Sequence, residues 1–164
     1  MIKLLLGISV VAFTSFCGYV FARKYRQKQL FFRQFYTFNE RFLSEISYYK
    51  RPLREFVKKY TYKEEFHQLL RFFFYGLEKK TLFLKDILDK QEFSFLNQEE
   101  KTIVADYFLM LGKGDSASQK NYFSSMREVL KKQQQEAENT CKKYADLYIK
   151  IGFLLGLLIL ILVL

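Results

Sequence analysis

The sequence has few of the residues that most often perform catalysis or hold metal ions. It contains one histidine, His67, two cysteines and no tryptophan. A metal site built from several histidines is therefore excluded, and His67 suits the surface of a helix better than the role of a catalytic base. Cys17 and Cys141 lack the spacing of a redox or zinc motif, so we expect reduced thiols. These shortages predict no catalytic residue, no cofactor and no metal.

Residues that interrupt helices are also scarce. Pro52 is the only proline, and the chain has 7 glycines in 164 residues. Long stretches contain nothing that would stop a helix, which predicts an all-α fold. The segment from Gly112 to Ser116 superficially resembles a phosphate-binding loop, but it lacks the required order of residues and follows an expected helix. A helix end followed by a helix start explains it better.

Acidic residues are outnumbered, because 17 Asp and Glu stand against 27 Lys and Arg, a net charge of +10. Such an excess can indicate nucleic-acid binding, but the basic clusters flank two apolar segments, as the positive-inside rule predicts for membrane proteins. We therefore expect a membrane as partner and no nucleic acid. The alternative is a membrane-anchored basic scaffold or regulator that binds anionic lipid or nucleic acid. The flanking residues are Arg23, Lys24, Arg26, Lys28, Lys142, Lys143 and Lys150.

The two apolar segments predict transmembrane helices. The first, residues 4–22, is uncharged and at about 1.5 Å per residue nearly spans the roughly 30 Å hydrocarbon core. The second, residues 151–164, covers only about 21 Å, so Tyr148 and Lys150 are expected to extend it to the headgroups. Basic residues follow the first segment and precede the second, which places the part between them in the cytoplasm. The predicted divisions are a transmembrane helix at 1–22, a cytoplasmic helical domain at 23–148 and a transmembrane helix at 149–164.

Small residues in these segments predict close helix packing. Gly152 and Gly156 form a GxxxG pattern, and Thr14 and Gly18 have the same spacing in the first segment. Such notches let two backbones approach in lipid, and antiparallel helices would bring the two pairs to similar depths. Because glycine is common in membrane helices, the alternative is that these residues only fill space.

In the first half of the domain, apolar residues recur at helical spacing. The first helix is expected to continue until residues 50–52. Pro52 suits the first position of a short helix that ends near Lys59. Thr61 with Glu64 has capping-box spacing and predicts a third helix. The expected apolar face of this helix consists of Phe66, Leu69, Leu70, Phe73 and Leu77.

The second half of the domain contains further helix signals. A short helix is expected over residues 81–90, and Asn97 with Glu100 predicts the start of another, which should end at Leu111 and Gly112. Its expected apolar residues are Ile103, Tyr107 and Met110.

The last predicted helix is the longest. Ser116 with Gln119 has capping-box spacing, and residues 117–164 contain no glycine or proline before Gly152. One helix should therefore run directly into the membrane and pack antiparallel to the first. Its expected packing face consists of Phe123, Met126, Leu130, Ala137, Cys141, Tyr144 and Tyr148.

Several motifs resemble those of the stage III sporulation protein AB family of endospore-forming bacteria. The turn formed by Leu111, Gly112, Asp115 and Gln119 matches the family pattern LG-x-S-D-x-x-x-Q, although Gly114 stands at the serine position. A second motif leads into the terminal apolar helix through Lys143, Tyr144, Leu147, Tyr148, Gly152 and Gly156. The weaker N-terminal match comprises Lys3, Leu4, Gly7, Glu45, Ile46, Tyr48, Pro52, Leu53 and Glu55.

The resemblance implies a membrane-anchored helical bundle whose soluble domain is similar to the platform F-protein of type II secretion systems. It implies a non-enzymatic component of the channel complex between mother cell and forespore, located in the mother-cell membrane. The implied partners are a secretion-type ATPase, stage III sporulation protein AA, and other stage III sporulation membrane proteins. The turn at residues 111–119 is expected to be a structural reversal or a partner surface, and the glycine notches leave self-association open.

Overall fold

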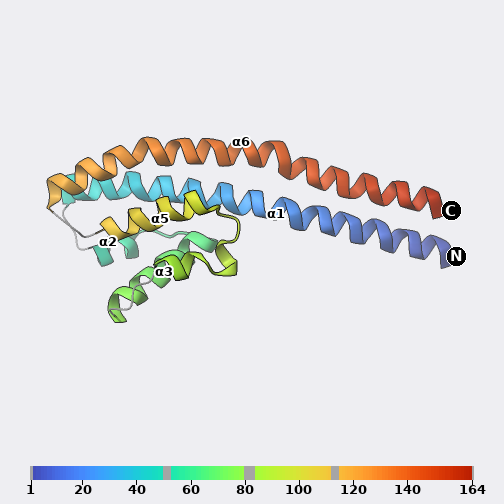
Figure 1. Cartoon of the computed structure of the whole chain (residues 1–164), viewed down its shortest axis with the longest axis horizontal. Helices are drawn as coiled ribbons and strands as arrows, with labels where there is room; N and C mark the ends of the chain where they lie inside the picture. Colours follow the sequence, from blue (N-terminus) through green and yellow to red (C-terminus); the bar gives the residue numbers. More distant parts are fainter. Residues whose placement is uncertain (1, 50–52, 80–83, 112–114, 164) are drawn as a thin grey trace. The chain divides into compact units, whose positions relative to one another are not determined.

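The chain folds into helices joined by short connections. We describe it from a computed structural model that covers residues 2–49, 53–79, 84–111 and 115–163. Every regular element in these ranges is helical, which confirms the predicted all-α fold. Figure 1 shows the two long helices, α1 (Ile2–Ser44) and α6 (Ser116–Val163).

Two compact units make up the structure. Unit 1 contains Met1–Gln29 and Gln135–Leu164, and unit 2 contains Leu30–Gln134. Helices α1 and α6 contribute to both units, so unit 1 consists of the first part of α1 and the last part of α6. Unit 1 includes both predicted membrane segments and extends beyond each of them. The boundaries of the predicted membrane segments stay predictions.

The connections after α1 follow the sequence signals. A π-helical turn, η1 (Glu45–Tyr49), directly follows α1, and α2 (Leu53–Lys59) begins after the predicted break. Pro52, the expected first residue of this short helix, lies outside the described residues. The helix expected over residues 81–90 forms as α4 (Leu84–Leu88), and residues 81–83 lie outside the described part of the chain. A 3₁₀ turn, η2 (Gln91–Phe93), follows α4.

Aromatic rings of α1 and of the helices around it form the core of unit 2. Phe31, Phe35, Phe38 and Phe42 of α1 are buried at steps of three and four residues, so they share one face of the helix. Most of their ring contacts are edge to face or tilted, an arrangement that contributes about 0.5–1.5 kcal/mol per pair beyond the area buried. The partner rings include Phe56 of α2, Phe66 of α3 (Glu64–Lys79), Tyr107 and Phe108 of α5 (Gln98–Met110), and Phe123 of α6.

The start of α3 differs from the prediction. The helix begins at Glu64, whose φ is +47°, and Thr61 does not cap it. Instead, the side-chain amide of Gln34 on α1 binds the preceding residue. Gln34 Oε1 accepts a hydrogen bond from the Lys63 N–H at 2.5 Å, and Gln34 Nε2 donates to the Lys63 carbonyl at 3.1 Å. A contact from another helix thus replaces the predicted local capping box.

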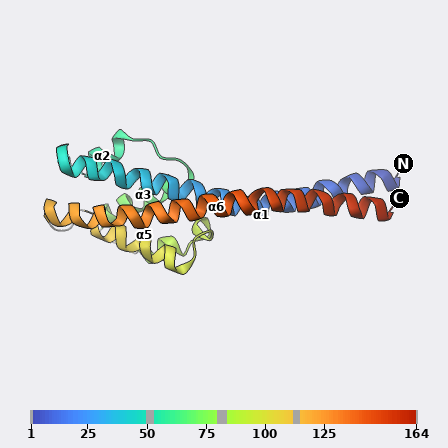
Figure 2. The same ribbon diagram turned by 90° about the horizontal axis from the view of Figure 1, so that it is seen from above.

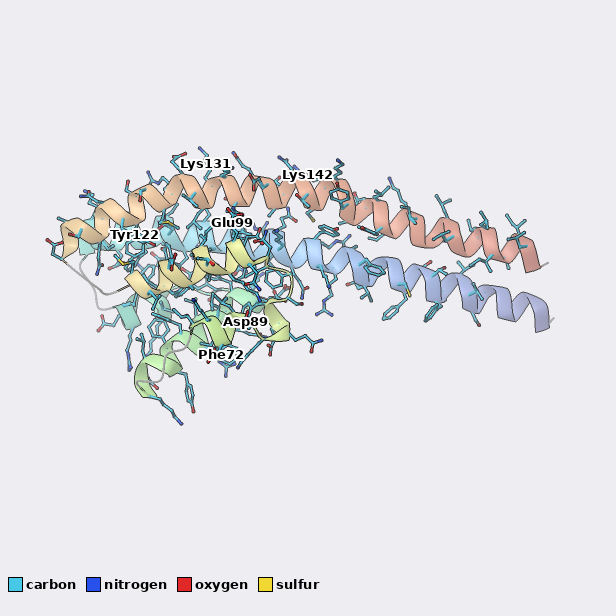
Figure 3. All side chains as sticks on the ribbon, viewed as in Figure 1. Phe72, Asp89, Glu99, Tyr122, Lys131 and Lys142 are labelled. Carbon is cyan, nitrogen blue, oxygen red and sulfur yellow. The ribbon has the colours of Figure 1, made fainter. Side chains whose placement is uncertain are left out.

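The start of α5 follows the prediction. Asn97 Oδ1 accepts a hydrogen bond from the Glu100 N–H at 2.8 Å, and Glu100 Oε2 accepts one from the Asn97 N–H at 2.9 Å. The predicted capping box is therefore confirmed, with two backbone donors satisfied by two side chains. Lys101 in the first turn also donates to Asp89 Oδ1 at 2.8 Å (Figure 3 labels Asp89), which ties α5 to the segment after α4.

The buried faces of α3 and α5 are rotated slightly from those predicted. In α3, Leu77 is 43% exposed and Gly76 is buried. In α5, Val104 is fully buried, whereas Ile103 and Met110 are only half-buried. The spacing of apolar residues fixes the helix but not its rotation against neighbours, which the aromatic contacts decide. The remaining predicted residues are buried, namely Phe66, Leu69, Leu70, Phe73 and Tyr107.

One polar side chain is fully buried where α1, α5 and α6 meet. Asn39 of α1 donates through Nδ2 to the Phe123 carbonyl at 3.1 Å, and its Oδ1 accepts from the Tyr107 hydroxyl at 3.0 Å. Burial raises the pKa of Tyr107 well above its usual range, so the hydroxyl stays a donor. Nearby, Arg127 donates to both carboxylate oxygens of Glu40 at 2.6 and 2.9 Å. Together these bonds fix the register of the three helices, because sliding any one would leave buried polar groups unsatisfied.

We expect Tyr107→Phe to destabilise the protein by about 1–3 kcal/mol, because it leaves the buried Asn39 Oδ1 without its donor. The full-length chain in detergent should then melt several degrees lower when unfolding is followed by circular dichroism. Tyr122→Phe on α6 is the matched control, because that side chain is only half-buried. Equal melting temperatures for Tyr107→Phe and the control would contradict a role of the amide network in stability.

Candidate helix-packing interface

In unit 1, α1 and α6 lie side by side and run in opposite directions (Figures 1 and 2). Gly7 near the start of α1 lies against Leu160 near the end of α6. Further along α1, Gly18 lies against Gly152. The contacts therefore follow the order of an antiparallel pair.

Gly18 and Gly152 mark a close approach of the two backbones. A methyl group added to Gly18 would lie 2.5 Å from the Tyr148 carbonyl oxygen and 3.3 Å from the Gly152 Cα. A methyl group added to Gly152 would lie 2.6 Å from the Thr14 carbonyl oxygen and 3.1 Å from the Gly18 Cα. Because these neighbours are backbone atoms, they cannot move aside unless the whole helix moves. Any side chain at either position would force the helices apart.

Gly156 lies one helical turn beyond Gly152 in the same interface. A methyl group there would collide with Thr14 Oγ1 and would lie 2.8 Å from the Val11 Cα. Thr14 Oγ1 lies 3.1 Å from the carbonyl oxygens of both Val10 and Val11, so the hydroxyl finds an acceptor within its own helix. The structure thus brings together all four residues that the sequence singles out for helix packing.

Small buried residues continue this interface along the pair. Ala22 of α1 packs with Cys141 and Ala145 of α6, and all three are at most 7% exposed. Burial raises the pKa of Cys141, which favours the protonated, less reactive thiol. Cys141 is among the packing residues that the sequence predicts, whereas Ala22 and Ala145 are not. Ala22 follows Gly18 by four residues and Ala145 follows Cys141 by four residues, and this helical spacing of small residues indicates that they share the same face.

Stacked aromatic rings flank the small residues. The ring of Tyr25 stacks on those of Tyr144 and Tyr148, with centroids 5.6 and 5.7 Å apart. Phe21 also stacks on Tyr148, at 5.9 Å. Four α6 positions in this unit are predicted to face α1. Cys141, Tyr144 and Tyr148 contact α1, and the fourth, Ala137, is buried.

Large apolar side chains cover the outer sides of the pair. Their exposed fractions are high, such as 68% for Phe13 and 77% for Leu162. By length and composition, α6 over Ala117–Leu162 is the one helix in the described ranges that could cross a membrane. A second span in α1 stays a prediction. Other exposed residues of this kind are Phe16, Val20, Phe153, Leu154, Leu158 and Ile161.

Basic residues lie at the level of the stacked tyrosines. Arg23, Lys24 and Arg26 surround Tyr25 in the sequence, and Lys142 and Lys143 precede Tyr144, which stacks on Tyr25. All five cations are exposed, as is Lys150, and Lys28 is half-buried. Lys142, labelled in Figure 3, donates to Glu138 on the same helix at 2.7 Å. Both helices of unit 1 therefore carry positive charge at the same level.

The start of α6 differs by one residue from the prediction. Ser116 already belongs to the helix, and Asp115 occupies the capping position. Asp115 Oδ1 accepts a hydrogen bond from the Ser118 N–H at 2.8 Å, and its carbonyl accepts one from the Gln119 N–H at 3.0 Å. Hydrogen bonds from the side chain and backbone of Ser118 lower the pKa of Asp115, so the carboxylate stays charged as a cap.

The other side of this turn is the end of α5. The N–H of Leu111, which is buried, donates to the Phe108 carbonyl at 3.3 Å. Gly112 lies outside the described residues. The structure therefore shows a helix end and a capped helix start around this turn, and its role as a partner surface stays a prediction.

The remaining chemical candidates are few. His67 is exposed on α3, as predicted for a surface residue. Among the residues that the structure describes, no three or more His, Cys, Asp or Glu side chains gather as they would around a metal ion.

Comparison with family models identifies the family to which the chain belongs. The model of stage III sporulation protein AB matches residues 3–164. The chain belongs to the stage III sporulation protein AB family. The resemblance inferred from the sequence motifs is confirmed, and with it a role in sporulation. Comparisons with curated proteins and with solved structures gave no match.

In this sporulation AB chain, Ala22→Cys should form a disulfide with Cys141 inside a single molecule, because both positions belong to one buried cluster. Cys17→Ser removes the other native thiol from the experiment. After mild oxidation of the full-length chain in membranes, mass spectrometry should detect the two linked peptides in monomeric protein. Val20→Cys, which is 45% exposed, is the control and should remain unlinked to Cys141.

Adding Gly152→Leu to the Ala22→Cys chain should sharply reduce this cross-link, because the new side chain meets backbone atoms of α1. Leu154→Phe adds bulk at an exposed position and should leave the cross-link intact. An undiminished cross-link with Gly152→Leu would show that the glycines only fill space.

Proposed function

We propose that this protein is a non-enzymatic platform subunit of the sporulation channel or of a secretion-like complex. Two helices hold it in the mother-cell membrane around the forespore, and its helical domain docks a secretion-type ATPase in the cytoplasm. The observation that carries the proposal is the glycine-packed pair of apolar helices in a member of a sporulation family. Structural and assembly roles characterise this family.

Helix pairing in lipid supports the membrane part of the proposal. Lipid tails are as apolar as leucine, so two membrane helices associate through close packing and not through the hydrophobic effect. Gly18 and Gly152 allow such packing in unit 1, and the exposed apolar residues on the outer sides match lipid. The charges of Arg23, Lys24, Lys142 and Lys143 lie at one level of both helices, as expected for a hairpin whose open end faces the cytoplasm.

This topology predicts how a cysteine at Ser47 reacts. Ser47 is exposed in η1 of unit 2, so Ser47→Cys offers an accessible thiol once Cys17 and Cys141 are replaced by serine. A membrane-impermeant maleimide should label it only after the cells are permeabilised. In non-sporulating cells that express the chain in the plasma membrane, a cysteine appended after the last residue should be labelled without permeabilisation. Labelling of Ser47→Cys from outside would reverse the proposed orientation.

The family resemblance and the surface of unit 2 support the docking part of the proposal. Stage III sporulation protein AA is the proposed ATPase, and an F-protein-like fold is the proposed architecture of the domain. Unit 2 has a buried aromatic core and exposed charged side chains outside it, such as Lys58 and Arg71. A rigid helical surface of this kind suits protein binding, because little conformational entropy is lost when a partner docks.

Co-purification tests the docking role. The tagged full-length chain, solubilised from sporulating cells in mild detergent, should retain the AA-type ATPase together with other stage III membrane proteins. An unrelated tagged protein with two membrane helices is the control. Recovery of the membrane proteins without the ATPase would contradict the docking role. Recovery of nucleic acid in their place would support a basic scaffold instead of a platform.

A further inference from the structure

A groove of about 920 Å³ lies on unit 2 beside α3. Residues of α2 and α3, together with α4 and the segment that follows it, line this groove. It is separate from the glycine-packed interface, which belongs to unit 1. None of the residues in the family motifs lines the groove. Arg54 of α2, which does line it, stands between the motif residues Leu53 and Glu55.

The lining of the groove is partly aromatic and incompletely covered. Phe72 and Phe74 of α3 and Ile87 of α4 are half-buried, and Tyr75 is 57% exposed. Figure 3 labels Phe72 on α3. Together these side chains give part of the groove an apolar surface. Exposed apolar patches on a folded domain commonly mark interaction sites.

Cations outnumber acids in the lining. Arg54 forms an ion pair with Glu78, with Arg54 Nη1 3.1 Å from Glu78 Oε1. Lys58 and Arg71 are exposed, and no acidic side chain in the described ranges lies within ion-pair distance of either. Four basic residues stand against two acidic ones, namely Arg54, Lys58, Arg71 and Lys90 against Glu78 and Glu92. The groove thus offers two unpaired cations next to aromatic surface.

We propose that this groove binds an acidic segment of a partner protein that also carries apolar side chains. Carboxylates of the segment would pair with Lys58 and Arg71, and its apolar side chains would cover Phe74 and Tyr75. This inference rests on the proposed docking role of unit 2 and assigns that role a surface and a chemistry. Charge complementarity of this kind gives specificity, and the buried apolar contact adds affinity.

The same residues disfavour nucleic acid. Bases would need the faces of the exposed rings for stacking, but Lys90 Nζ lies over the Phe72 ring at 4.1 Å and Lys79 Nζ over the Tyr75 ring at 4.8 Å. Glu92 also lines the groove, where it would repel phosphates. An acidic peptide can instead contact the basic side chains while its apolar residues pack on Phe74 and the edge of Tyr75.

Selection from a random peptide library tests this binding site directly. Peptides of about twelve residues, displayed on phage, are selected on the purified full-length chain in detergent. We expect enriched peptides that combine aspartate or glutamate with leucine or aromatic residues. Fluorescein-labelled copies should bind the double variant Lys58→Glu/Arg71→Glu at least about tenfold more weakly, because two attractive contacts become repulsive.

A matched variant controls for net charge. Lys120→Glu/Lys131→Glu makes the same charge change on exposed residues of α6 and should keep the affinity of the original chain. Circular dichroism melting of both double variants verifies their folding. Failure to enrich acidic peptides, or equal affinity for both double variants, would overturn the proposal.

Two further results separate this inference from alternatives. A labelled single-stranded oligonucleotide that bound the original chain and lost binding only in Lys58→Glu/Arg71→Glu would assign the groove to nucleic acid and overturn the proposal. The peptide measurements need no ATPase. Failure of the ATPase to co-purify would therefore contradict the proposed function, whereas peptides insensitive to Lys58 and Arg71 would contradict only the assignment of the groove.

Discussion

The buried amide of Asn39 determines which turns of α1, α5 and α6 face one another in unit 2. Rings alone would specify this poorly, because Phe35, Phe38 and Phe42 repeat along α1 and a slide of one turn exchanges one phenylalanine contact for another. The amide has one donor bonded to the Phe123 carbonyl and one acceptor bonded to the Tyr107 hydroxyl. A shifted register would leave these groups buried without partners, at a cost of about 1–3 kcal/mol each. Directional bonds therefore select one register from several that apolar packing alone would accept.

In unit 1, the steric fit between α1 and α6 determines their register. Its helices meet where Gly18 and Gly152 bring backbone atoms together, and the contact continues through Gly156 and Thr14. In lipid this closeness matters, because dispersion between well-fitted surfaces replaces the hydrophobic effect as the force that joins helices. If one helix slid along the other, a larger side chain would face each glycine, and the two backbones could no longer approach as closely. The register and rotation of the pair thus follow from the positions of a few small residues.

Features whose partners lie in one segment could be predicted from the sequence. The cap formed by Asn97 and Glu100 and the uninterrupted length of α6 are of this kind, since both depend on residues a few positions apart. Asp115 caps α6, one residue before the predicted Ser116. The sequence does not distinguish the two, because serine and aspartate are both good caps and stand side by side. The family, too, was recognisable from local motifs.

Features that depend on distant residues escaped prediction. Gln34 binds the backbone of Lys63 from another helix, and no local pattern reports such a contact. The groove on unit 2 likewise exists only once α2 and α4 are placed beside α3. Asn39 did leave a signal, because it interrupts the stripe of phenylalanines with a polar residue on the same face of α1. A polar residue in an aromatic stripe indicates a buried hydrogen-bond network, because burying it unpaired would cost too much free energy.

The use of polar groups in the described core bears on function. Asn39, Glu45 and Glu100 are buried in the described part of the chain. The Asn39 amide fixes register, and the Glu100 carboxylate completes a cap. Burial raises the pKa of Tyr107, so it remains a neutral donor to Asn39 and is not available as a base. Charges such as those of Lys58 and Arg71 and rings such as that of Tyr75 are exposed to other molecules. Groups of this kind recognise a partner by charge and apolar area, which is the chemistry that the proposed docking role requires.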